Sequence, residues 1–331
     1  MFVNLTNSYA KYLLAYYFFV NYNDIDEGDN MKKIESFNSG LNSSSLRNTI
    51  SYTSFKDEVS KIVSSEINNL RKREKSVVIG SGNLNDIDVD LLVDSFSLVN
   101  LTDIDIGSVK KALDFLRKDG KNYSNVEMTR IEYTGFEKNL FFTRFKEDII
   151  KLKNNKDIEV YLKKHLNNLE NYKFLKNDDD LYDLVYVSPI YTQLVYNELL
   201  YELSVLRGSG YPEHNIKFIE DYMIDEMIKI IERFNNNIIR VLNENGLLVV
   251  SSDIFQGDNR SDFIRNIISK IDDYQQMEKI YDNYVGDYGM GFGDFGLLDL
   301  DEKLEVISSK WVIWPFDDKS SFVVKIKVYK K

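Results

Sequence analysis

Ser76-Val77-Val78-Ile79-Gly80-Ser81-Gly82 is the stretch that decides the fold class, because a short apolar run ends here in two glycines. Further short apolar runs follow along the chain at residues 97–101, 125–131, 181–187 and 247–250. Helical patterns separate these runs, at residues 108–116, 192–206 and 215–242. Strands that alternate with helices predict a parallel sheet with helices on both faces.

The C-terminal end has a different pattern. Residues 311–316 and 321–329 are strand-like and flank the turn at 317–320, with no helix between them. This arrangement predicts an antiparallel hairpin. In the last strand Val324, Ile326 and Val328 alternate with Lys325 and Lys327, so the apolar residues share one face.

The remaining segments divide the chain further. Residues 1–75 are interpreted as a helical N-terminal region, and residues 76–331 as the α/β domain. Residues 136–180 are too long for one connection and carry helical patterns, which indicates a helical insertion. The glycine-rich stretch 286–296 is interpreted as a flexible loop, which could act as a lid over the substrate.

Composition excludes several classes of function. The net charge of −11 disfavours nucleic acid as a partner. The chain has no cysteine and two histidines, so we expect neither disulfides nor a metal site. The apolar run at residues 12–20 is shorter than the ~20 residues of a membrane-spanning helix and lacks the features of an export signal. We therefore expect a cytoplasmic protein with no membrane partner and interpret this run as a buried helix.

The first strand and the second predict a nucleotide site. In an open parallel sheet, ligands bind beyond the carboxyl ends of the strands, at the point where the strand order reverses. Gly80 and Gly82 let the backbone approach a ligand closely. Asp103 ends the second apolar run about 20 residues later, where a carboxylate can accept both hydroxyls of a ribose.

These residues carry a resemblance to a known family. Six segments resemble the class I S-adenosylmethionine-dependent methyltransferases: Val77–Asn83, Leu101–Asp105, Glu132-Tyr133, Tyr182–Ser188, Glu244–Val249 and the terminal hairpin. The resemblance covers residues 76–331 apart from the insertion. It implies a Rossmann-like, seven-stranded, mostly parallel sheet whose last strand is antiparallel, and S-adenosylmethionine as cofactor.

The resemblance also implies roles for individual residues. The glycine turn would face the methionine part of the cofactor, Asp103 would hold the ribose, and Glu132 and Tyr133 would flank the adenine. Val78 and Leu84 depart from the family pattern, so Asn85 or Asp86 would bind the cofactor's amino group instead. The implied cofactor-binding residues are Gly80, Ser81, Gly82, Asn85, Asp86, Asp103, Ile104, Glu132, Tyr133 and Ser188.

Three residues are candidates for the chemical step. Ser188-Pro189-Ile190-Tyr191 is similar to the (Asp/Asn/Ser)-Pro-Pro-(Tyr/Phe) loop of methyltransferases that act on amino groups, although the second proline is absent. In such a loop Ser188 would accept a hydrogen bond from an N–H group of the methyl acceptor. The Tyr191 ring would pack on the same acceptor. An ordinary strand-to-helix turn explains the same residues. His214 is either a general base or a solvated residue near a helix start.

The predicted function is methyl transfer from S-adenosylmethionine to a small-molecule acceptor in a closed pocket lined partly by Tyr191 and by N-terminal aromatic residues. The acidic chain favours a neutral or cationic acceptor. One alternative is a non-catalytic protein that binds S-adenosylmethionine or another partner on the same fold. The other is a nicotinamide-dependent oxidoreductase, which the terminal hairpin and the incomplete glycine motif disfavour.

Overall fold

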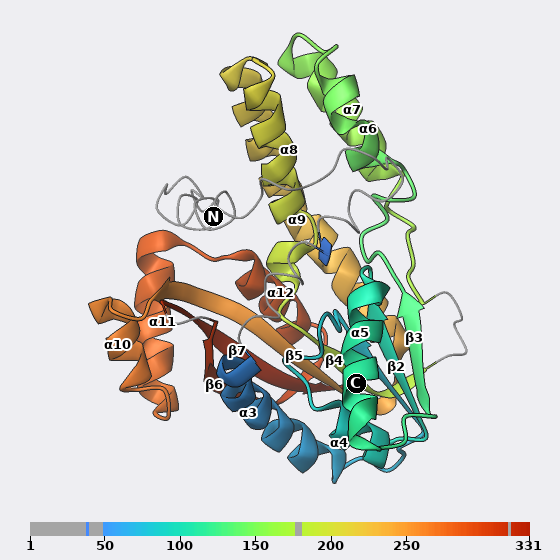
Figure 1. The fold of residues 1–331 in the computed structure, drawn as a ribbon. Helices are drawn as coiled ribbons and strands as arrows, with labels where there is room; N and C mark the ends of the chain where they lie inside the picture. Colours follow the sequence, from blue (N-terminus) through green and yellow to red (C-terminus); the bar gives the residue numbers. More distant parts are fainter. Residues whose placement is uncertain (1–37, 40–48, 176–180, 317–318) are drawn as a thin grey trace.

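The structure, a computed structural model, describes residues 38–39, 49–175, 181–316 and 319–331 (Figure 1). Its centre is a seven-stranded sheet in the order β3-β2-β1-β4-β5-β7-β6. Strand β7 runs antiparallel to β5 and β6, and the other paired strands are parallel. The predicted mostly parallel sheet with a C-terminal hairpin is therefore confirmed. The strands are β1 (Lys75–Ile79), β2 (Leu98–Asp103), β3 (Val126–Arg130), β4 (Tyr182–Val187), β5 (Leu242–Asp258), β6 (Glu305–Pro315) and β7 (Ser320–Lys330).

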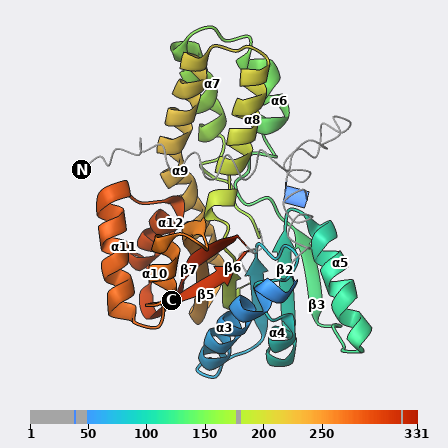
Figure 2. The same cartoon turned by 60° about the vertical axis from the view of Figure 1, so that its left-hand side comes forward.

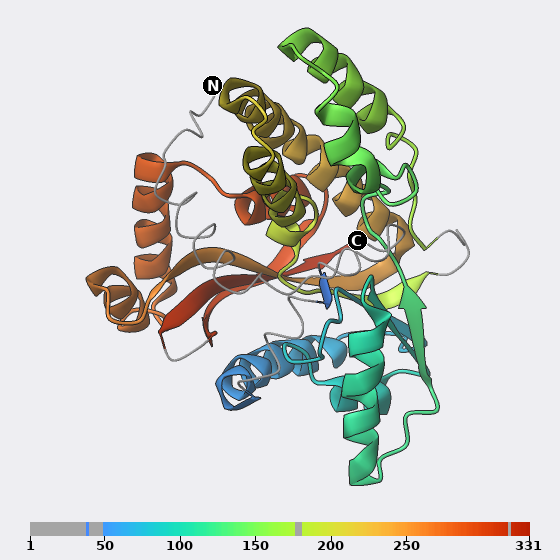
Figure 3. The same cartoon turned by 45° about the horizontal axis from the view of Figure 1, so that its top comes forward.

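Helices cover both faces of this sheet (Figure 3). Side chains alternate across a strand, so Val78 packs with one helical layer while Val77 and Ile79 pack with the other. The first layer contains α3 (Thr49–Ile67), α4 (Val89–Ser95) and α5 (Ile106–Leu116). The second contains the C-terminal half of α9 (Glu213–Val241) and α12 (Phe292–Asp301). A short 3₁₀ turn (Arg117–Asp119) follows α5, and another (Tyr191–Gln193) follows β4.

A helical arm projects beyond the carboxyl ends of the strands (Figure 2). It consists of α6 (Phe141–Ile149), α7 (Asn155–Asn167), α8 (Tyr196–Gly208) and the N-terminal half of α9. These helices share their own apolar cluster, separate from the two sheet layers. Helices α6 and α7 lie in the stretch where the sequence indicates an insertion. None of the helices in the described ranges is long and apolar enough to cross a membrane.

A further small cluster of apolar side chains lies at the long outer end of the sheet. Strand β5 continues well past the predicted run at residues 247–250, because it pairs with β7 as far as Asp258. Helices α10 (Asp262–Ile268) and α11 (Tyr274–Tyr288) pack here around Phe255 and Trp311. The run at residues 12–20 and the rest of the predicted helical segment up to residue 37 lie outside the described residues.

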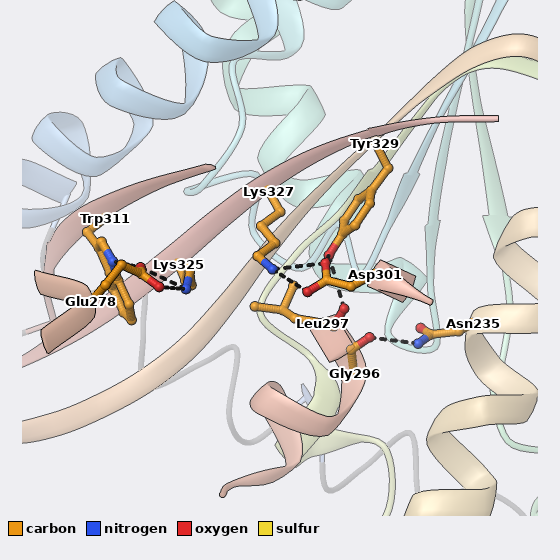
Figure 4. A network of polar contacts seen from close by, with 9 residues as sticks. All are labelled: Asn235, Glu278, Gly296, Leu297, Asp301, Trp311, Lys325, Lys327 and Tyr329. Atoms are coloured by element: carbon orange, nitrogen blue, oxygen red, sulfur yellow. Dashed lines mark hydrogen bonds and ion pairs between the residues drawn. The ribbon is translucent and has the colours of Figure 1, made fainter. Parts of the chain in front are cut away.

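Two lysines of β7, Lys325 and Lys327, attach helices to the sheet (Figure 4). Lys325 forms an ion pair with Glu278 of α11 at 2.9 Å and lies 4.7 Å from the centre of the Trp311 ring. Lys327 forms an ion pair with Asp301 of α12 at 2.6 Å. Both side chains are largely buried, at 7% and 12% exposure. The polar face of this strand is therefore an internal surface against α11 and α12.

The prediction of a flexible loop over residues 286–296 is wrong. Residues up to Tyr288 belong to α11, and α12 begins at Phe292. The backbone N–H of Gly291 donates to Asp294 Oδ2 at 2.7 Å, which caps the new helix. A Cβ atom at Gly293 would overlap Ser252, and one at Gly296 would overlap the Tyr191 ring. These glycines allow the helix to pack closely on the sheet. The spacing of glycines in the sequence does not distinguish this role from that of a flexible loop.

This packing predicts opposite effects for two glycine-to-alanine substitutions. Gly296→Ala adds a methyl group against the buried Tyr191 ring, so it should lower the free energy of unfolding by about 1–3 kcal/mol. Gly286→Ala, on the exposed side of α11 with no atom within 4 Å of its Cβ, should raise it by up to about 1 kcal/mol. Urea unfolding followed by circular dichroism measures both. Equal stability of the two variants would contradict the assigned packing of α12.

Candidate functional site

The glycine turn after β1 lies at the carboxyl edge of the sheet, between β2 and β4. Gly80 and Gly82 have φ angles of +78° and +46°, a conformation that favours glycine. The N–H groups of Gly80 and Ser81 donate to the Thr102 carbonyl of β2, at 3.1 and 2.9 Å. On the other side, a Cβ atom at Gly80 would lie only 2.6 Å from Ile190 of the loop after β4. The turn is therefore in direct contact with both neighbouring strand ends.

Asp103 fixes the turn to the end of β2. Its Oδ2 accepts the Gly82 N–H at 2.8 Å, and its Oδ1 accepts the Asp105 N–H at the same distance. Burial raises the pKa of Asp103, and these two N–H bonds oppose the rise. Each carboxylate oxygen still has a lone pair for another donor. Asp103 and the adjacent Ile104 are both almost fully buried.

Tyr133 and Glu132, at the end of β3, have different contacts. The Tyr133 hydroxyl accepts the Gly80 N–H at 2.9 Å and donates to the Thr102 carbonyl at 2.8 Å, so it reaches the glycine turn across β2. Burial raises its pKa. The Glu132 carboxylate accepts N–H bonds from Thr134 and Gly135 at 2.7 and 2.6 Å and thereby stabilises its own loop. Burial also raises the pKa of Glu132.

Asp86 follows the glycine turn, and Ser188 begins the loop after β4. Their side chains lie close to each other where the turn contacts the loop. Burial raises the pKa of Asp86 to about 6, while the nearby Ser188 hydroxyl partly offsets this rise. The Ser188 Oγ is buried, yet it forms no hydrogen bond of normal geometry within the described part of the chain. Ser81 is also buried, and its hydroxyl donates to the Val78 carbonyl at 3.3 Å. Asn85, the other candidate for the amino group, is partly exposed.

The structure does not bring the other two catalytic candidates to this point. Tyr191 is fully buried, and its hydroxyl donates to Asn235 Oδ1 of α9 at 2.9 Å. Gly296 of α12 packs against its ring. His214 is exposed at the second position of α9. It lies about 30 Å along the helix axis from Phe234, which packs against the sheet.

Sequence reasoning missed polar residues at the end of the apolar part of β5. Thr192 Oγ1 donates to Asp253 Oδ2 at 3.4 Å, which joins this strand to the loop after β4. Burial raises the pKa of Asp253 to about 7. Ser251-Ser252-Asp253 follows the apolar run 247–250 directly. Asp103 is a candidate because it is a polar residue at the carboxyl end of a strand. The same criterion would have identified Ser251, Ser252 and Asp253.

The raised pKa of Asp86 predicts a pH-dependent effect of Asp86→Asn. A carboxyl whose pKa rises from 3.8 to about 6 on folding contributes stability below pH 4 and loses it as the pH rises through 6. The neutral amide avoids this loss, so the variant should be more stable than wild type by about 2–3 kcal/mol at pH 8 and nearly equal at pH 4. Urea unfolding at the two pH values measures the difference. Asp114→Asn, a half-exposed side chain of α5, is the control. A gain that is the same at both pH values would refute the assignment.

Comparisons with known proteins find similarity to solved structures of methyltransferases, at low sequence identity. No family model and no curated protein matches the sequence. The N-methyltransferase NodS from Bradyrhizobium japonicum is 10% identical, with 84% of this chain and 97% of that one covered and a TM-score of 0.40. A SAM-dependent methyltransferase from Aquifex aeolicus is 12% identical, with 86% and 97% covered and a TM-score of 0.41. A putative S-adenosyl-L-methionine-dependent methyltransferase from Methanococcus maripaludis is 12% identical, with 91% and 96% covered and a TM-score of 0.39. At these values the fold assignment rests on the order and direction of the strands in the chain itself.

Proposed function

We propose that the protein transfers a methyl group from S-adenosylmethionine to a small-molecule acceptor. The observation that carries this proposal is the Asp103 carboxylate bonded to the Gly82 N–H at the carboxyl edge of the sheet. The order of strands reverses between β1 and β4, which is where open α/β sheets bind their ligands. The cytoplasmic location expected from the sequence is part of the same proposal.

The donor and acceptor groups around the glycine turn fit this cofactor. Its ammonium group needs a carboxylate, and Asp86 supplies a buried one beside the Ser188 hydroxyl. Its ribose needs acceptors, and Asp103 has free lone pairs on both oxygens. The N–H of Gly80 already has a partner in the Tyr133 hydroxyl. We therefore assign Asp86, Ser188 and Asp103 as the residues that hold the cofactor.

The protein's part in such a reaction is mainly positioning. A bound S-adenosylmethionine supplies an activated methyl group. The residues of this chain would hold the acceptor in line with that group and exclude water, which converts a bimolecular step into an intramolecular one. Ser188 begins the loop that would border the acceptor. Tyr191 supports this loop from behind, because its ring packs between α9 and α12.

Calorimetric titration of Asp103→Ala with S-adenosylhomocysteine tests the cofactor assignment. We expect binding to weaken by about 1.5–3 kcal/mol, since a charge-assisted hydrogen bond to the ribose is lost. Asp103→Asn should weaken it less, because its amide oxygen still accepts the Gly82 N–H. Asp114→Ala on the exposed side of α5 is the matched control and should bind like wild type. Undiminished affinity in a folded Asp103→Ala protein would show that the ligand binds elsewhere.

The same titration distinguishes the alternatives. Binding of NAD in place of S-adenosylhomocysteine would favour an oxidoreductase. Binding of S-adenosylhomocysteine without turnover of any acceptor would favour a non-catalytic protein. The close contact of Ile190 with Gly80 and the Tyr133 hydroxyl on the turn are the features that a non-catalytic role would explain.

A further inference from the structure

The loop after β4 has a carboxylate on each side. Asp86 lies on the β1 side, close to Ser188 at the start of the loop. Asp253 lies on the β5 side, where it accepts the hydroxyl of Thr192. Because β1 and β5 are the two neighbours of β4, these carboxylates flank the region beyond the end of that strand.

Asp253 has few partners for a desolvated carboxylate. Its Oδ2 atom accepts a hydrogen bond from the Thr192 hydroxyl at 3.4 Å. Its Oδ1 atom is buried and has no hydrogen-bond partner among the residues that the structure describes. The charged group that faces it from α12 is Asp294, which repels it. Within the described ranges no lysine or arginine forms an ion pair with Asp253.

A buried hydroxyl next to Asp253 in the chain also lacks a partner. Ser252 is 0% exposed, and its Oγ atom has no hydrogen-bond partner in the described part of the chain. Buried polar atoms in native proteins nearly always have a partner, so each exception requires an explanation. The carboxylate is only an acceptor when ionised, and hydroxyls can also accept. The missing partner of the Asp253 carboxylate is therefore a hydrogen-bond donor.

We propose that Asp253, supported by Thr192, binds the amino group of the methyl acceptor, so that the acceptor is a primary or secondary amine. This inference rests on the proposed methyltransferase function and deepens it. Asp86 then serves the cofactor on the β1 side of Ser188, and Asp253 serves the acceptor on the β5 side. An amine supplies one or two N–H donors and, when protonated, a positive charge as well, whereas an alcohol supplies one donor without charge and a carboxylate anion supplies no donor.

Asp253 also receives the proton of the reaction. The neutral amine nitrogen gives its lone pair to the methyl carbon, and the electrons of the carbon–sulfur bond return to sulfur. The new ammonium group then loses one proton to the Asp253 carboxylate, which passes it to water. Burial raises the pKa of Asp253 to about 7, with Asp294 adding to the rise and Thr192 opposing it. The carboxylate form that binds the amine is therefore the main form above pH 7.

A titration of the Asp253 carboxyl carbon by NMR tests this assignment without turnover. The full chain, saturated with S-adenosylhomocysteine, is titrated with and without methylamine, butylamine or benzylamine. We expect at least one amine to lower the pKa of Asp253 by one unit or more, because a bound ammonium favours the carboxylate. Benzyl alcohol should leave it unchanged. A pKa that responds to none of the amines, or equally to the alcohol, would overturn the proposal.

A second experiment measures methyl transfer from labelled S-adenosylmethionine to the same probe molecules. Asp253→Asn should lower transfer to the amines at least 100-fold and leave the affinity for S-adenosylhomocysteine within twofold of wild type. Asp258→Asn, a partly exposed aspartate on the same strand, is the matched control and should leave both unchanged. Undiminished transfer by Asp253→Asn would overturn the proposal. Absence of S-adenosylhomocysteine binding in wild type would instead refute the proposed function itself.

Discussion

The hydrogen bond from the Gly82 N–H to the Asp103 carboxylate is the interaction on which the candidate site depends. It joins the turn after β1 to the end of β2, and the second oxygen of Asp103 joins the same point to the start of α5 through Asp105. A desolvated carboxylate with two N–H bonds has a defined position, because moving it would leave a buried charge without partners. The turn can then adopt its left-handed glycine conformations and bring the loop after β4 to within contact of Gly80.

Close backbone approach recurs on the opposite side of that loop. Gly293 and Gly296 let α12 pack directly on Ser252 and on the Tyr191 ring. Asn235 of α9 donates to the Gly296 carbonyl and accepts the Tyr191 hydroxyl, so three elements meet at one residue. Lys327 then attaches the end of α12 to β7 through Asp301. The loop that borders the candidate acceptor site is thus supported by helices whose own positions are set by glycines and one ion pair.

Desolvation gives the site its chemical character. Burial moves the pKa values of Asp86 and Asp253 to about 6 and about 7, near neutral pH. Each carboxylate therefore costs folding free energy when it ionises without a partner. A ligand that brings positive charge to these positions recovers that free energy. Carboxyl groups with strongly shifted pKa values at the carboxyl ends of parallel strands are typical of functional sites.

The sequence by itself determined the alternation of strands and helices as far as β5, the C-terminal hairpin, and the positions of Gly80, Gly82 and Asp103. Those features follow from apolar runs and glycines that are close together in the chain, and local backbone preferences govern them. The tertiary structure decided the surroundings of each side chain. It placed Tyr133 on the glycine turn, Tyr191 in the core beneath α12, and His214 at the far end of the helical arm. It also made a helix of the residues after Gly291 and brought Asp253 beside Thr192. Those outcomes depend on contacts between residues that are distant in the sequence, because burial and partner choice are set only when the layers pack together.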